Sequence, residues 1–238
     1  MLKKENKSKI ICIIPARGGS KGVPKKNVIN VAGKPLIAHS IDHGIKSRYV
    51  NRIVVSTDDL EICEVSERYG AEVIKRPKEL SGDKAKSESA LIHVLDYLKK
   101  NENYSPDLVV FLQATEPIRK PEYIDEAVQK LIENNADSCF SAYLQEKFFA
   151  HWIISNDGNP IPINMELSNR PIRQEFPTEY IENGNIYVFK PSILYENGDR
   201  LGGKIVIYPM HVLDSFGIDD LKDIVIVEDI LKMRFGIS

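Results

Sequence analysis

One stretch of the sequence combines residue types that bind phosphate. Directly after a short apolar run, positions 15–27 read PARGGSKGVPKKN, which places three glycines and four basic side chains in one loop. Glycines let backbone N–H groups approach a phosphate, and arginine and lysine neutralise its charge. The glycine spacing matches neither GxGxxG nor GxxxxGK[ST], which disfavours a dinucleotide-binding fold and a P-loop. A solvated basic turn is the alternative, but a loop at the carboxyl end of a predicted first strand favours a ligand site.

The elements that position this loop follow from the apolar pattern. Short β-rich runs alternate with longer segments of helical period, which is typical of βαβ units on a mostly parallel sheet. We expect strands at 10–14, 52–56, 72–75, 108–112, 138–143, 184–189 and 204–210. Three intervening helices and a closing helix over 219–235 should each bury one apolar stripe. These stripes comprise Ile37, Ile41 and Ile45; Leu91, Val94, Leu95 and Leu98; Ile124, Ala127, Val128 and Leu131; and Ile224, Val227, Ile230 and Leu231.

The composition excludes several classes of protein. With 238 residues, 42% apolar and 28% charged, the chain is long enough to bury a sizeable core. The 32 basic and 34 acidic residues leave a net charge of −2, so we expect neither nucleic acid nor a membrane as partner. Three separated cysteines without a CxxC pair suit buried free thiols and a cytoplasmic location. The apolar run at 10–14 is too short for a signal peptide or a membrane span.

Six segments of the chain resemble, in the same order, the motifs of the acylneuraminate cytidylyltransferases. The first is the basic loop with its strand, IIPARGGSKGVPKKN from residue 13. The others are STD at 56–58, KRP at 75–77, LQATEPIR at 112–119, RQE at 173–175 and ENGNIY at 182–187. One such motif would be weak, but six in order over nearly the whole chain are a specific signal.

The resemblance implies both a fold and a reaction. The implied fold is a three-layer α/β/α sandwich of the nucleotide-diphospho-sugar transferase type, a single cytidylyltransferase domain over 1–238 from which 143–182 projects as a dimerisation segment. The implied reaction transfers CMP from CTP to the anomeric hydroxyl of a nine-carbon 2-keto-3-deoxy sugar acid and releases pyrophosphate. The acceptor would be a sialic acid or a legionaminic or pseudaminic relative. We therefore expect a homodimer that uses CTP, a nonulosonic acid and Mg²⁺, or Mn²⁺ in its place.

On the nucleotide side, cations must neutralise the leaving pyrophosphate. Arg17, Lys21 and Lys26 supply three of them near the implied triphosphate, and we assign Arg17 and Lys21 as catalytic together with Asp219. The resemblance implies nucleotide contacts by Ala16, Gly18, Lys26, Asn27, Arg76 and Ser87. Ser87 fits a helix N-cap equally well, and Asp58 also fits the cap of a helix starting near residue 59.

On the acceptor side, the resemblance implies four substrate-binding residues. A planar guanidinium suits a carboxylate, and Arg173 falls at the family's carboxylate-binding position. Gln113 can donate to and accept from sugar hydroxyls. Asn183 and Tyr187 would wall the sugar, although for Tyr187 ordinary strand packing fits equally well. His151 stands about where a family lysine helps to bind the carboxylate.

The metal site departs from the family pattern. Mg²⁺ prefers oxygen ligands and usually takes one or two protein carboxylates beside phosphates and water. Many family members carry an Asp-x-Asp pair before the last helix, but here Gly217 takes the first position and Asp219 alone keeps its place. We expect Asp219 to bind the metal, with Asp214 or Asp58 assisting. Asp219 also fits the N-cap of the last helix.

Several other polar residues leave their roles open. Glu116 departs from the family's serine and fits either a contact with an amino or hydroxyl group of the sugar or a cap of the turn before Pro117. His39 and His43 have a spacing that can bind zinc, but without a third ligand an ordinary polar helix edge is favoured. The general base stays unassigned between a metal-bound hydroxide and an aspartate.

The segment from residue 143 to 180 lacks clear periodicity. Residues 155–162, with Asn-Asp-Gly and two prolines, should break any regular element. Phe148, Phe149 and Trp152 resemble the projection through which family members dimerise, although such aromatics also fit packing under a loop.

Two other functions stay open. One is a cytidylyltransferase for the eight-carbon acid Kdo or its amino analogue. The motif at Arg173 and the pair Asn183-Gly184 favour nine-carbon acids over this alternative. The other is a non-catalytic nucleotide- or sugar-binding regulator, which only the glycine at position 217 supports.

Overall fold

A seven-stranded sheet forms the centre of the protein. The computed structural model describes residues 8–20, 22–82, 85–146, 150–169, 172 and 178–237. The strand order is β11-β7-β10-β6-β1-β4-β5, and β10 alone runs antiparallel to its neighbours. The bounds are β1 (Ile10–Pro15), β4 (Arg52–Thr57), β5 (Glu72–Lys75), β6 (Leu108–Leu112), β7 (Ser138–Leu144), β10 (Tyr180–Phe189) and β11 (Ile205–Met210).

Helices cover both faces of this sheet. One core joins the sheet to α1 (Leu36–Lys46), α2 (Leu60–Arg68) and α4 (Pro121–Glu133). The other joins it to α3 (Ser87–Glu102) and α5 (Pro191–Asn197). Strand β1 serves both, because Ile10, Cys12 and Ile14 point to the first core and Ile11 and Ile13 to the second. The predicted three-layer α/β/α fold is confirmed.

Smaller elements surround these layers. Helix α6 (Leu221–Phe235) packs on a third, smaller core with Val31, Leu36 and Ile118. The remaining elements are β2 (Asn30–Val31), β3 (Lys34–Pro35), β8 (Trp152–Ile154), β9 (Pro160–Pro162) and the 3₁₀ helices at Lys26–Val28, Lys78–Leu80 and Val212–Ser215.

Several expectations from the sequence need correction. The stripe on α1 ends early, since Ile45 is exposed. His39 and His43 do not form a polar helix edge: both are buried, which lowers the pKa of His39 to about 4 and holds that of His43 well below its usual range. The expected break at 155–162 holds for the Asn-Asp-Gly turn, but Pro160–Pro162 is strand β9, which pairs with β8 as an antiparallel hairpin around that turn. The sequence analysis did not predict α5.

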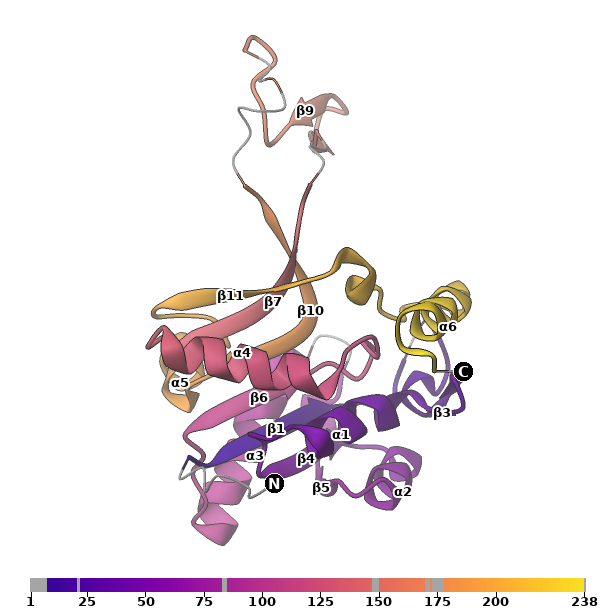
Figure 1. The fold of residues 1–238 in the computed structure, drawn as a ribbon, viewed down its shortest axis with the longest axis vertical. Helices are drawn as coiled ribbons and strands as arrows, with labels where there is room; N and C mark the ends of the chain where they lie inside the picture. Colours follow the sequence, from indigo (N-terminus) through magenta and orange to yellow (C-terminus); the bar gives the residue numbers. More distant parts are fainter. Residues whose placement is uncertain are drawn as a thin grey trace.

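A narrow projection rises from the sheet. Strands β7 and β10 continue beyond the body of the protein as a paired ribbon, and the hairpin of β8 and β9 lies at its end, at the top of Figure 1. Its exposed apolar side chains include Trp152, Ile153, Ile154 and Ile161. Within the described ranges, no helix is long and apolar enough to cross a membrane. Cys12, Cys63 and Cys139 are buried free thiols, as expected.

The parallel pairing decides where polar residues gather. Strands β6, β1, β4 and β5 lie side by side and run in the same direction, so their carboxyl ends meet at one edge of the sheet. The loops that follow them start at residues 113, 16, 58 and 76. Four of the six motif segments therefore converge at this edge.

Candidate active site

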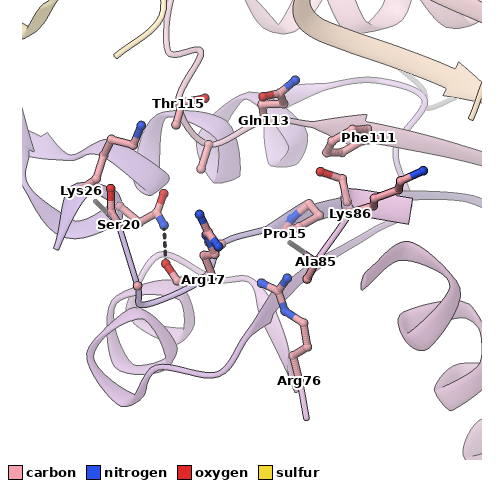
Figure 2. Close-up of a pocket in the computed structure, with 15 residues that line it drawn as sticks. Pro15, Arg17, Ser20, Lys26, Arg76, Ala85, Lys86, Phe111, Gln113 and Thr115 are labelled. Atoms are coloured by element: carbon pink, nitrogen blue, oxygen red, sulfur yellow. Dashed lines mark hydrogen bonds between the residues drawn. The ribbon is translucent and has the colours of Figure 1, made fainter. Parts of the chain in front are cut away.

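A cavity of about 300 Å³ opens at this edge of the sheet. Four of its lining residues are basic, namely Arg17, Lys26, Arg76 and Lys86, and none is acidic among the described residues. In Figure 2, Arg17 and Arg76 approach the cavity from the side opposite Gln113 and Thr115. The other lining residues are Pro15, Ala16, Gly19, Ser20, Asn27, Ala85, Ser87, Phe111 and Ala114. Such a lining suits a ligand with several negative charges.

Hydrogen bonds fix the basic loop over the ends of two strands. The Ala16 N–H donates to the Ser56 carbonyl at 2.9 Å, and the Gly18 N–H donates to the Asp58 carboxylate at 3.1 Å. The Asn27 side chain donates to the Arg17 carbonyl at 3.0 Å. Of the three predicted nucleotide contacts here, Ala16 and Asn27 line the cavity and Gly18 does not.

Arg76 and Ser87 both line the cavity. Arg76 is buried and donates to the Ser56 carbonyl at 2.9 Å, and burial together with nearby Arg17 lowers its pKa. A buried guanidinium beside a second cation is costly unless an anion or a polar ligand shares the site. Ser87 lines the cavity as the first residue of α3. It is not the N-cap, since that position belongs to Lys86.

The loop after β6 forms the opposite wall, and a fully buried arginine holds it. Arg119 donates to the carbonyls of Gln113, at 2.9 Å, and of Glu116. It also donates to Asn185 at 2.6 Å and to Ser40 at 3.2 Å. Burial lowers the pKa of Arg119 to about 10. The Gln113 side chain lines the cavity on this anchored loop.

Lys26 joins the cavity to the segment before α6. Its ammonium group donates to the Ile218 carbonyl at 2.8 Å and to the Asp219 carboxylate at 3.1 Å. The Lys26 side chain is 13% exposed and that of Asp219 is 95% exposed. Asp219 therefore presents its carboxylate at the mouth of the cavity, next to a lining cation.

The other aspartates have different roles from those expected. The N-cap of α6 is Asp220, in a capping box with Asp223, so Asp219 is not the cap. The N-cap of α2 is Asp59, and Asp58 instead accepts the Gly18 N–H. Asp214 is buried and pairs with Arg234 at 2.6 Å, so it is not available to assist a metal at Asp219.

The Glu116 carboxylate lies beside Gly217. Burial, with a contribution from the charge of Asp219, raises the pKa of Glu116 to about 7. Its Oε2 atom is buried and, among the described residues, has no hydrogen-bond partner. Glu116 is therefore a carboxylate near the cavity with an unsatisfied oxygen atom.

Two predicted sugar-binding residues are occupied by protein contacts. The Asn183 side chain accepts from Ser141 at 2.6 Å and donates to Ser215 at 3.1 Å. Tyr187 is buried, stacks on Phe111 with ring centroids 5.3 Å apart, and donates its hydroxyl to Glu182. Neither lines the cavity, and the strand-packing interpretation describes Tyr187.

Lys21 and Arg173 lie outside the described residues, as do Phe148 and Phe149. The cavity also contains residues that the sequence analysis did not assign, among them Lys86, Phe111 and Thr115. Phe111 looked like an ordinary strand residue, and Lys86 belongs to no motif segment. Only the position of Thr115 inside the LQATEPIR segment pointed to a role.

A comparison with known protein families identifies the family of this chain. The model of the cytidylyltransferase family matches residues 11–212. The chain belongs to this family. Cytidylyltransferases with curated names also match it over most of its length. It is 35% identical to the zebrafish (Danio rerio) N-acylneuraminate cytidylyltransferase A over 98% of the chain, but spans only 53% of that relative.

Two bacterial relatives are matched over a larger share of their own length. The Campylobacter jejuni pseudaminic acid cytidylyltransferase (strain 81-176) is 37% identical over 75% of the chain and 77% of its own length. The Campylobacter coli post-translational flagellin modification protein B is 33% identical over 95% of the chain and 97% of its own length. Among solved structures, CMP:2-keto-3-deoxy-manno-octonic acid synthetase in complex with CTP superposes with a TM-score of 0.70 at 17% identity, over 96% of this chain and all of that one. At that identity the likeness concerns the fold.

Proposed function

We propose that the protein transfers CMP from CTP to the anomeric hydroxyl of a nonulosonic acid and releases pyrophosphate. The observation that carries this proposal is the cavity at the carboxyl edge of a parallel sheet, whose described lining residues include four cations and no carboxylate. A triphosphate fits such a lining, and membership of the cytidylyltransferase family supports CTP as its source. The names of the relatives support a sialic-acid-type acceptor.

The cations would act on the triphosphate. In phosphoryl transfer, positioning and charge neutralisation supply most of the catalysis. Arg17 and Lys26 would neutralise the departing pyrophosphate, and Arg76, which donates to the Ser56 carbonyl, would contact the nucleotide. Gln113 would orient an acceptor hydroxyl from the opposite wall. In the same proposal, Lys21 assists on the triphosphate and Arg173 binds the acceptor carboxylate.

The residues at the mouth of the cavity fit a divalent cation. The Asp219 carboxylate is exposed and lies next to the cavity, and a Mg²⁺ ion needs only one or two such ligands when phosphate oxygens supply others. Glu116, whose charge interacts with that of Asp219, offers a further hard oxygen, since its Oε2 atom has no hydrogen-bond partner among the described residues. When bound, the cation would polarise the phosphoryl oxygens. The protein's own residues would bind the nucleotide and place the acceptor.

Pyrophosphate release from CTP and Mg²⁺ tests the function directly. We expect release with at least one of N-acetylneuraminate, legionaminate and pseudaminate, and a comparison with Mn²⁺ would show whether that ion substitutes. Release with Kdo alone would identify the eight-carbon alternative. No release with any 2-keto-3-deoxy sugar acid, while CTP binds, would favour a nucleotide-binding regulator.

We further propose that the projection mediates a homodimer. Trp152, Ile153, Ile154 and Ile161 expose apolar surface on a two-stranded hairpin that has little core of its own. We expect a dimer in sedimentation at micromolar concentration, and Ile154→Glu should shift it toward monomer. Leu221→Glu, which changes an apolar residue on α6 that is also well exposed, is the matched control. A monomeric parent protein would refute the proposal.

A further inference from the structure

Two segments far apart in the sequence meet at the mouth of the cavity. The Ile218 N–H donates to the Thr115 carbonyl at 2.9 Å, which ties the segment before α6 to the loop after β6. Thr115 lines the cavity, and Lys26 bonds to the Ile218 carbonyl from the other side. Glu116 and Asp219 are therefore the next residues in the chain after the two that this hydrogen bond joins, at the border of the cavity.

The Glu116 carboxylate occupies the space that a side chain at position 217 would take. A Cβ atom built on Gly217 would lie 2.1 Å from Glu116 Oε1 and 2.6 Å from Oε2. Real Cβ atoms do not approach other atoms so closely. Any side chain at position 217 would thus displace the Glu116 carboxylate. Because residue 217 is glycine, the Glu116 carboxylate can occupy this space, although residue 217 itself has no carboxylate.

Among the described residues the Glu116 carboxylate has few hydrogen-bond partners, although the charges of Arg119 and Lys26 act on it. Its Oε2 atom is buried and has no hydrogen-bond partner in the part of the chain that the structure describes, and its Oε1 atom is at the long distance of 3.5 Å from the Thr115 hydroxyl. A buried carboxylate oxygen without a donor costs free energy, and an ion is one of the few explanations for such a group. By contrast, buried Asp125 accepts hydrogen bonds from both Ser47 and Arg48.

We propose that Glu116 is a second carboxylate ligand of the divalent cation, beside Asp219, and that Gly217 is the residue that admits it. The inference rests on the proposed function, because the cation would serve nucleotidyl transfer. Two carboxylates plus triphosphate oxygens match the way proteins hold Mg²⁺. The Lys26 ammonium, bonded to Asp219, holds one of the two ligands in position from the side of the basic loop.

The test measures how much Mg²⁺ tightens CTP binding, by calorimetry in the presence of Mg²⁺ and of a chelator. In the parent protein we expect Mg²⁺ to tighten binding clearly. In Glu116→Gln, which keeps the shape but removes the charge, this gain should fall at least about tenfold, since even the outer partners of metal ligands contribute that much. The affinity for metal-free CTP should stay the same or rise. An unchanged gain in Glu116→Gln would overturn the proposal, as would a parent protein with no gain.

Three further variants separate metal binding from packing. Asp125→Asn neutralises a buried carboxylate elsewhere and should keep the gain. Gly217→Ala should lose it, because the new Cβ expels Glu116. The exchange Glu116→Ser with Gly217→Asp returns a carboxylate to the same space from the other segment and should restore the gain. A folded exchange variant without the gain would contradict the proposal.

The outcomes also distinguish this inference from the proposed function. If the parent releases pyrophosphate with Mg²⁺ while Glu116→Gln keeps the full gain, the function stands and the ligand assignment fails. If the gain depends on Glu116 but no sugar acid leads to pyrophosphate release, the ligand assignment stands and the function fails.

Discussion

Lys26→Met should lower the rate of CMP transfer by about 10²–10³-fold, the loss typical of removing one group that stabilises developing charge. Lys26 lines the cavity, and its ammonium group is held by the Ile218 carbonyl and the Asp219 carboxylate. The variant therefore loses a cation at the triphosphate and also releases the segment that carries Asp219. The measurement is kcat for pyrophosphate release at saturating CTP and Mg²⁺.

The neighbouring lysine provides a matched control for this prediction. The Lys25 side chain is 73% exposed and pairs with Glu61 on the surface, so its charge does not reach the cavity. Lys25→Met should keep kcat within about a factor of two, because exposed ion pairs contribute little. Lys26→Arg, which keeps the charge, should retain more activity than Lys26→Met. Equal kcat values for Lys25→Met and Lys26→Met would contradict the assigned role of Lys26.

The sequence predicted the sheet well because its signals are local. The run Leu108–Leu112 is apolar throughout and is β6 with the same bounds, and the stripe of Leu91, Val94, Leu95 and Leu98 is buried on α3. Helix α5 was missed because its seven residues, Pro191–Asn197, are too few to show a helical period. The hairpin of β8 and β9 was missed because its prolines suggested a break, although proline is tolerated in short edge strands.

In the candidate site, too, local features could be predicted from the sequence and contacts between distant segments could not. The basic loop could be found from the sequence because its glycines and cations lie within thirteen positions. The caps offered as alternatives at Asp58, Ser87 and Asp219 each miss the N-cap by one residue, because the N-cap depends on where the backbone turns and not on residue type alone. The contact between Glu116 and Gly217 joins residues about a hundred positions apart. No spacing rule within a single sequence reveals such a pair.

Gly184 leaves the space that the Gln113 side chain occupies, and its substitution should therefore weaken acceptor binding. Gly184 lies at an irregularity in β10 with φ +69°, and a Cβ there would lie 2.9 Å from Gln113 Nε2. Gly184→Ala should therefore push the Gln113 amide away from its place on the cavity wall. Because the Gln113 side chain is flexible, the fold should tolerate this shift, and the expected effect is weaker binding of the acceptor.

We expect Gly184→Ala to raise the KM for the sugar acid about tenfold, which corresponds to the ~1.4 kcal/mol at the upper end of one hydrogen bond. The KM for CTP should change little. Gly198→Ala is the matched control, because Gly198 has φ +66° and nothing lies within 4 Å of its added Cβ. Both variants incur the left-handed backbone cost of about 1–2 kcal/mol, so both should unfold at lower temperature. An equal change in the acceptor KM of both variants would mean that backbone strain, and not Gln113, causes the effect.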